Sequence, residues 1–211
     1  MSLEAAAIQI GTAWNHAKLC LELTKPRLTL MALATTFLGY AAGSAKGSSF
    51  GVLASLHVII GSAMIGGGAN ALNQWLERDV DAKMKRTSGR PIPSGRLSER
   101  SAFIFGLVIS IAGLAYLFFF NGLLTFLFGA TTLLGYTLVY TPLKKVSILN
   151  TFVGAVAGAL PILMGWSASG SSLDLEAGVL FLILFIWQLP HFAAIAWVYK
   201  DDYLSAGLKM F

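Results

Sequence analysis

Three oxygen-bearing side chains recur at four-residue spacing near the end of one long apolar stretch. Asn73, Glu77 and Asp81 occupy positions i, i+4 and i+8, so a helix that continues through Asp81 places all three on one face. These side chains suit Mg²⁺, which takes a few protein oxygens and completes its shell with water and phosphate oxygens. Asp79 lies off this face and is expected to reach the ion from the side. The spacing therefore predicts a magnesium site that shares its ion with a phosphorylated ligand.

Basic side chains follow the acids directly, and Pro91 and Pro93 then end any helix. Lysine and arginine neutralise a diphosphate by point charge and by forked hydrogen bonds. A solvated charge run that only sets membrane topology and binds anionic lipid is the alternative, but topology requires no acids on a shared helical face. We therefore interpret the region as a diphosphate–metal site. Its phosphate-binding candidates are Lys83, Lys85, Arg86 and Arg90.

The elements that must position this site are membrane-spanning helices. Of the 211 residues, 56% are hydrophobic and only 12% are charged, and the mean hydropathy is +0.71. This balance excludes an ordinary soluble domain. Since a helix of about 20 residues crosses the ~30 Å hydrocarbon core, we expect an all-α integral membrane protein, a multi-span helical bundle. Its six expected spans lie near residues 26–45, 51–72, 101–120, 122–140, 148–168 and 178–199.

Lysine and arginine are strongly biased to one side of these spans. Of the 15, only Lys46 falls on the other side. The positive-inside rule then places both ends of this chain in the cytoplasm, at a cell inner membrane, with the mitochondrial inner membrane as the alternative. We expect residues 1–25 to be an amphipathic lead-in and residues 26–211 to be the membrane domain. The single Cys20 excludes an intrachain disulfide.

Further polar residues are expected on the same side as the acidic face. Tyr140, Lys144 and Lys145 end the fourth span, where they could close over a diphosphate or act as ordinary interfacial and topology residues. His191 lies inside the sixth span, directly after Pro190. An ionisable side chain in a span is a candidate for function, and a hydrogen-bonded packing role is the alternative.

Three blocks of the chain resemble the UbiA superfamily of intramembrane prenyltransferases, and within it the haem branch, the protoheme IX farnesyltransferases or haem O synthases. The first block is residues 73–96, in which an Asn is followed by acids at four-residue spacing and then by Arg-Pro. The second is residues 140–166, which open with Tyr-Thr-Pro-Leu-Lys-Lys. The third, residues 187–207, contains Gln-Leu-Pro-His and is the most discriminating. Glu77 stands where the wider superfamily has an aspartate, which also resembles the haem branch.

This resemblance implies a reaction and a role for each candidate residue. The farnesyl group of farnesyl diphosphate would be transferred to a vinyl group of haem b, giving haem O and diphosphate. The implied catalytic residues are Asp81, Glu77, Asp79, Lys144 and Tyr140. The implied Mg²⁺ ligands are Asn73, Glu77, Asp79, Asp81, Asp201 and Asp202, with the choice between one and two ions left open. The implied substrate-binding residues are Lys83, Lys85, Arg86, Arg90, Lys145, His191 and Lys200.

The resemblance also sets expectations for the whole protein. Superfamily members are understood to have nine spans, so a chain with six is expected to be incomplete at its C-terminus. The expected partners are farnesyl diphosphate, haem b and the lipid bilayer, together with haem A synthase or the assembly of haem–copper oxidases; nucleic acid is not expected. Two alternatives stay open: a UbiA-type prenyltransferase for a quinone or chlorin acceptor, and a non-catalytic haem-binding assembly factor or transporter.

Overall fold

The computed structural model describes residues 14–46 and 50–209, and every regular element in those ranges is a helix. The expected all-α architecture is therefore confirmed. A leading helical segment, residues 14–23, comes first. It is followed by α2 (Pro26–Ser44), α3 (Val52–Asp81), α4 (Glu99–Asn121), α5 (Leu123–Leu134), the π-helix η1 (Gly135–Tyr140), α6 (Thr141–Leu143), α7 (Asn150–Ala168), α8 (Leu175–Val198) and α9 (Lys200–Ser205).

Capping side chains and a glycine turn mark where several of these helices begin and end. The side chains of Ser98 and Asp174 each accept a hydrogen bond at 3.1 Å from a backbone N–H of the first turn, and so cap α4 and α8. Gly122, with a φ of 86°, forms the sharp turn between α4 and α5. The next three elements form one continuous apolar helix, Leu123–Leu143, whose middle turn is wound as η1. Helix α4 and the start of the Leu123–Leu143 helix therefore form a tight hairpin.

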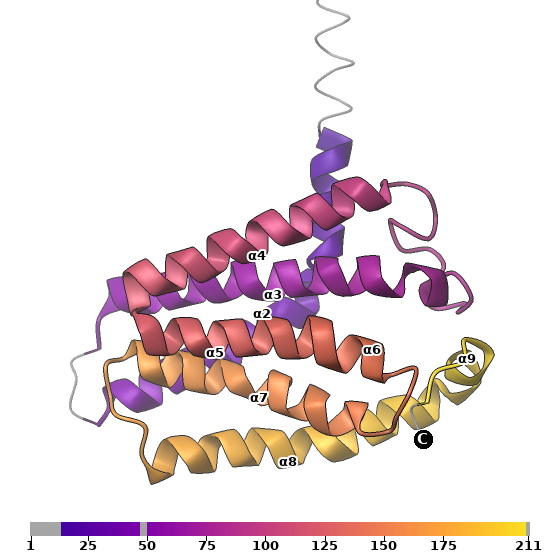
Figure 1. Cartoon of the computed structure of the whole chain (residues 1–211). Coiled ribbons are helices and arrows are strands. Elements are labelled where there is room, and N and C mark those ends of the chain that lie inside the picture. The colour runs from indigo at the N-terminus through magenta and orange to yellow at the C-terminus, as the bar shows by residue number, and fades with distance from the viewer. Residues whose placement is uncertain (1–13, 47–49, 210–211) are drawn as a thin grey trace, which may run out of the picture.

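The long helices run antiparallel to their neighbours in sequence, and α7 lies at the centre, against α2, α5 and α8 (Figure 1). The backbones of α2 and α7 approach each other closely at two glycines. A Cβ atom on Gly39 would lie 2.0 Å from the Ile162 carbonyl oxygen, and a Cβ atom on Gly165 would lie 1.8 Å from the Thr36 carbonyl oxygen. Small residues at such crossings allow helices to pack tightly in lipid, where apolar burial alone gives little preference for helix contact.

Five of the described helices are long and apolar enough to cross a membrane: α3, α4, the Leu123–Leu143 helix, α7 and α8. Their outer faces expose large apolar side chains such as Leu107, Leu138 and Ile183, as a lipid-facing surface requires. The remaining expected span, the first, is the 19-residue helix α2, which is not among these five because its first turn contains Arg27 and the helix contains several Thr and Gly residues. The chain is a multi-pass membrane protein.

The two ends of the bundle differ in composition. One end, which we call the charged end, contains the connection between α3 and α4, the turn after α6, and α9 (Figure 1). At the opposite end, Lys46 Nζ lies 2.9 Å from Asp174 Oδ2 and also pairs with Glu176. The Ser171 hydroxyl donates to the Gly43 carbonyl oxygen at 2.7 Å. These contacts join the end of α2 to the start of α8.

Candidate active site

One face of α3 carries the three oxygen-bearing side chains into the protein at the charged end. The helix extends past its expected end at residue 72 and continues through Asp81, as the spacing of the acids requires. Asn73, Glu77 and Asp81 are all buried, with at most 7% of each residue exposed. Since a buried acid is costly unless it is paired, the partners of this face determine what the site can do.

Each of these three side chains accepts a hydrogen bond from a different basic residue. The bases come from three separate parts of the chain: the turn before α2, the connection between α3 and α4, and the turn after α6. We call these six residues the paired cluster. Its contacts are Lys25 Nζ to Asn73 Oδ1 at 3.0 Å, Lys144 Nζ to Glu77 Oε1 at 2.7 Å, and Arg90 Nη1 to Asp81 Oδ2 at 2.5 Å.

The connection between α3 and α4 folds back so that Arg90 reaches Asp81. The buried Thr87 donates its hydroxyl to the Asp81 carbonyl oxygen at 2.9 Å, and the Arg90 N–H donates to the Thr87 carbonyl oxygen at 3.0 Å. Ile92 and Leu97 are buried in an apolar cluster with residues of α3 and α4, which anchors the connection. Arg90 is therefore held by a compact, packed turn.

The end of the Leu123–Leu143 helix places Tyr140 and Lys144 together. The Tyr140 ring packs directly on Gly154 of α7, where an added Cβ atom would lie 2.7 Å from the ring. Lys144 Nζ lies 4.4 Å from the centroid of this ring, in a cation–π contact, while it also pairs with Glu77. Burial disfavours the Lys144 ammonium, but Tyr140 and Glu77 outweigh this and raise its pKa above the ordinary value. Lys144 is thus a fixed, charged donor beside the acidic face.

Lys25 is a member of the cluster that the sequence interpretation missed. Its place before a span, followed by Pro26 and Arg27, is indistinguishable from that of a topology lysine. In the structure, burial first and then the nearby Arg90 lower the pKa of Lys25 to about 7. Its backbone is left-handed, with a φ of 47°, and it is the one non-glycine residue with positive φ among those described.

The paired cluster retains one buried oxygen without a partner. Asp81 Oδ1 accepts no hydrogen bond from the described part of the chain, although Oδ2 of the same carboxylate is paired with Arg90. Residues 14–46 and 50–209 contain no group of three or more His, Cys, Asp and Glu side chains that could hold a metal ion by themselves. The donor set of two carboxylates and one amide therefore fits a hard cation that takes the rest of its shell from phosphate and water, as Mg²⁺ does.

Several predicted site residues lie outside the paired cluster. Asp79 points to solvent, with 79% of its side chain exposed, and its nearest charged neighbour is Arg78 at 4.0 Å. Lys83, Lys85 and Lys145 are also exposed. These four residues are close in sequence to members of the paired cluster, but their side chains face solvent and do not join it.

The residues after α8 pack on the charged end in contacts of their own. The Arg86 guanidinium lies 4.7 Å from the centroid of the Tyr199 ring, and Lys200 lies over a tryptophan ring at 5.8 Å. Asp201 is exposed and Asp202 is half-buried on α9, and neither forms an ion pair within the described residues. Arg86 is thus held by aromatic rings rather than by the acids of α3.

The two polar residues of the Gln-Leu-Pro-His block face different surroundings on α8. Gln188 is buried against Gly158 of α7, where an added Cβ atom would lie 2.2 Å from Gln188 Oε1. His191 is exposed and stacks on Trp187, with ring centroids 4.9 Å apart. Gln188 therefore lies between helices α7 and α8, whereas His191 lies on the exposed surface of α8.

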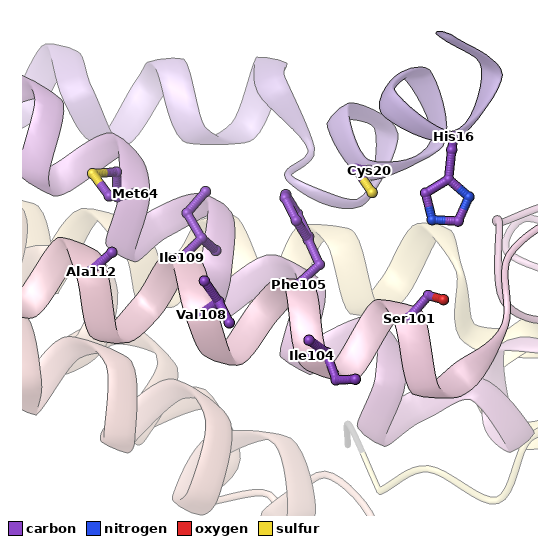
Figure 2. A pocket seen from close by; sticks show the side chains of 9 residues that line it. All are labelled: His16, Cys20, Met64, Ser101, Ile104, Phe105, Val108, Ile109 and Ala112. Atoms are coloured by element: carbon purple, nitrogen blue, oxygen red, sulfur yellow. The ribbon is translucent and has the colours of Figure 1, made fainter. Parts of the chain in front are cut away.

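A cavity of about 540 Å³ lies away from the paired cluster, between the leading helical segment and α4 (Figure 2). His16 and Cys20 line it from the leading segment, Met64 lines it from α3, and the rest of its lining is mostly apolar side chains of α4. None of the predicted site residues borders it. The cavity and the paired cluster are separate features.

The sequence of this chain is similar to that of known membrane proteins of one family. The profile of the UbiA prenyltransferase family matches residues 32–211. A protein named protoheme IX farnesyltransferase from Solibacter usitatus is 47% identical over 197 residues, which cover 90% of this chain and 68% of that protein. A protein of the same name from Opitutus terrae is 44% identical over 190 residues, covering 90% of this chain and 63% of that protein. The chain thus spans about two thirds of the length of these relatives.

Solved structures show the same fold. A UbiA homolog from Archaeoglobus fulgidus bound to GPP and Mg²⁺ superposes with a TM-score of 0.76 at 20% identity, over 90% of this chain and 67% of that one. The structure of a digeranylgeranylglyceryl phosphate synthase gives a TM-score of 0.75 at 21% identity, over 91% of this chain and 66% of that one. At this level of identity the likeness concerns the arrangement of helices.

Proposed function

The chain belongs to the UbiA prenyltransferase family, and from this premise we propose that it transfers a farnesyl group from farnesyl diphosphate to a vinyl group of haem b, forming haem O and releasing diphosphate. One observation carries the proposal: a buried oxygen face on α3 in which each side chain is met by a base from a different element. The names of the relatives that are 40–47% identical support haem b as the acceptor.

The cation and the diphosphate would be held at the paired cluster. Asn73, Glu77 and Asp81 would provide the protein ligands of Mg²⁺, which supplies Lewis-acid stabilisation of the leaving group when bound. Arg90 and Lys144 have the charge and reach to hold phosphate oxygens. Asp201 and Asp202 on α9 are a second acidic pair that we propose to act at the same end. The number of ions depends on this second pair.

The reaction requires that negative charge be stabilised on a leaving group. As the allylic C–O bond breaks, its electron pair passes to the diphosphate oxygen, and interactions that strengthen with this charge lower the barrier. Arg90 and Lys144 supply such interactions because both are fixed by packing rather than free in solvent. A vinyl carbon of haem b then bonds to the farnesyl carbon, and water adds to the resulting cation with loss of a proton, which leaves a hydroxyl group.

His191 is the proposed contact for the acceptor. It is exposed on α8 and its ring is oriented by the stack on Trp187. A flat, aromatic acceptor such as a porphyrin could extend this stack, and the imidazole could bind its iron. We propose that the protein acts at a cell inner membrane with the charged end in the cytoplasm, where haem A synthase or haem–copper oxidase assembly would use the product.

The test is a reaction of the purified protein with farnesyl diphosphate, haem b and Mg²⁺, followed by mass spectrometry of the extracted haem. We expect a haem whose mass has increased by one farnesyl group and one hydroxyl group, with release of diphosphate that stops on chelation and returns with Mg²⁺. Prenylation of an aromatic acid in place of haem would favour a quinone-type acceptor. Haem binding without any release of diphosphate would favour a non-catalytic haem-binding protein and would contradict the proposal.

A further inference from the structure

The orientation of the Asn73 amide decides whether it can bind a cation. An asparagine side chain ends in an oxygen, which can ligate a metal ion, and an NH₂ group of similar size, which cannot. A rotation of the amide by half a turn exchanges the two. The contacts on both sides of Asn73 specify which group faces which way.

On one side, the partner of Asn73 is the side chain of Lys25, whose Nζ lies 3.0 Å from Asn73 Oδ1. In its protonated form Lys25 is a donor without lone pairs, so only the amide oxygen can accept this bond. Asn73 lies on the same face of α3 as Glu77 and Asp81, and the Lys25 contact fixes which end of its amide is the oxygen.

On the other side, the partner of Asn73 has only a lone pair to offer. Asn73 Nδ2 donates to Thr141 Oγ1 at 3.0 Å. The hydroxyl hydrogen of Thr141 is already donated to the Tyr136 carbonyl oxygen, five residues earlier, at 2.7 Å. This spacing is that of the π-helix η1, in which the backbone bond runs over five residues rather than four. Thr141 therefore accepts and requires an NH₂ group opposite it.

The turn that presents Lys25 is itself fixed by side chains of α3. Gln74 Nε2 donates to the Leu23 carbonyl oxygen at 2.9 Å, and Asn70 Nδ2 donates to the Thr24 carbonyl oxygen at 3.2 Å. The left-handed backbone of Lys25 is a conformation that side chains other than glycine rarely adopt, and it persists where surrounding contacts hold it. The same helix that carries Asn73 thus also aims the ammonium at it.

We propose that Lys25 and Thr141 are positioning residues that fix the orientation of the Asn73 amide, with Oδ1 facing Lys25 and Nδ2 facing Thr141, so that this oxygen, on the face of α3 shared with Glu77 and Asp81, can ligate a divalent cation. This inference rests on the proposed function, since it refines the cation site of that reaction. Lys25 would thus act through Asn73. The π-helical turn would place the Tyr136 carbonyl oxygen where it accepts the hydroxyl hydrogen of Thr141, so that this hydroxyl can only accept from Asn73.

The proposal predicts that loss of the Lys25 charge weakens cation binding, whereas simple electrostatics predicts that it strengthens cation binding. Removing the positive charge of Lys25 should by itself favour a cation nearby, because a repulsion is lost. If Lys25 orients Asn73, the same change instead weakens cation binding, because the amide can turn its NH₂ group towards the site. Thr141→Val leaves the charge unchanged and removes the hydroxyl that accepts from Asn73 and donates to the Tyr136 carbonyl oxygen, so it should also weaken cation binding.

The experiment is a titration of the purified protein in detergent with Mn²⁺ alone, followed by electron paramagnetic resonance of the free ion. We expect Lys25→Met and Thr141→Val each to raise the Kd for Mn²⁺ at least about fivefold, and the double variant to be little weaker than either, since one locked amide is lost only once. Lys25→Arg and Thr141→Ser, which keep the donor and the acceptor, should stay within about twofold of the parent. Lys18→Met, at an exposed lysine of the leading segment, is the matched control and should not change the Kd.

Two outcomes separate failure of this inference from failure of the proposed site. If Asp81→Asn abolishes Mn²⁺ binding but Lys25→Met and Thr141→Val bind as tightly as the parent or more tightly, the positioning role is wrong and the cation site stands. If the parent binds no Mn²⁺, or Asp81→Asn binds it equally well, the proposed site is wrong and the inference falls with it. Thermal unfolding of each variant identifies any that fail to fold, and Thr141→Val, a substitution of similar shape, provides the test if Lys25→Met is one of them.

Discussion

Asp81 and Asp79 show how two carboxylates of one motif acquire different roles. Both belong to the same acidic stretch, but two residues rotate an α-helix by about 200°. Asp81 therefore points into the protein, with Oδ2 on Arg90 and Oδ1 without a partner in the described chain, while Asp79 points to solvent. The orphaned oxygen of Asp81 is what a cation would use.

Asp81→Asn should lower the rate of farnesyl transfer by at least about 100-fold, because a neutral amide replaces a ligand that acts where charge develops. Asp79→Asn should retain at least about a third of the parent rate, since an exposed charge contributes little. Both are measured as Mg²⁺-dependent release of diphosphate. Equal losses in the two variants would show that the buried face is not the metal site.

Lys144→Met should raise the KM for farnesyl diphosphate about tenfold or more, because a hydrogen bond to a charged group is worth about 1.5–3 kcal/mol. Lys145→Met is the matched comparison: this neighbouring lysine is exposed and outside the paired cluster, so its KM should change by less than about threefold. Steady-state kinetics at saturating haem b give both values. A KM that is unchanged in Lys144→Met would leave Lys144 as a topology lysine.

The members of the candidate site were predictable from the sequence only in part. The four-residue period located Asn73, Glu77 and Asp81, because a helix converts that period into one face. The same reasoning could not separate Arg90 and Lys144, which pair with acids, from the exposed Lys83 and Lys85. All are basic residues at a helix end, and only the fold of the intervening turns distinguishes them.

At the scale of elements, two features of the helices position the site. The π-helix η1 shifts the residues that follow it, so that Thr141 reaches both the Tyr136 carbonyl oxygen and Asn73. Glycines let helices come close enough for these contacts: Gly154 receives the Tyr140 ring and Gly165 receives the backbone of α2. A π-helical turn leaves no clear mark in composition, whereas the glycines are visible in the sequence without their partners.

Gly165→Ala should destabilise the bundle by about 1–3 kcal/mol, the usual cost of forcing an extra methyl group into a packed interior. The added Cβ atom would lie 1.8 Å from a carbonyl oxygen of α2, so the helices must move apart. Gly178→Ala on α8 is the matched control, because a Cβ atom there has no neighbour within 4 Å. Thermal unfolding in detergent should show a lower midpoint for Gly165→Ala alone; equal midpoints would argue against tight packing of α2 on α7.

At the scale of the whole molecule, charge and site lie at the same end of the bundle. Lys46 is the single basic residue of 15 that the span assignment puts on the other side, and it pairs there with Asp174 and Glu176. The remaining bases include the three that complete the paired cluster. One distribution of charge can therefore orient the protein in the membrane and supply a binding site for a diphosphate.

The orientation can be tested with single cysteines placed at the two ends, after replacement of Cys20 by serine. Ser172→Cys, in the exposed turn before α8, should react with a membrane-impermeant maleimide in intact bacterial cells. Ser205→Cys, exposed at the end of α9, should react only after the membrane is permeabilised. The reverse pattern would place the charged end outside the cytoplasm and would contradict the positive-inside interpretation.

The sequence by itself determined the class of this protein, its helices and the acidic face, because hydropathy and a four-residue period are properties of neighbouring residues. Its motifs also identified the family, which the profile match confirmed. Only the tertiary structure decided which bases meet those acids, that Lys25 and Thr141 contact Asn73, and that Asp79 points to solvent. These contacts join residues that are 9 to 68 positions apart. Such pairs depend on how helices pack and turns close, and no local pattern records them.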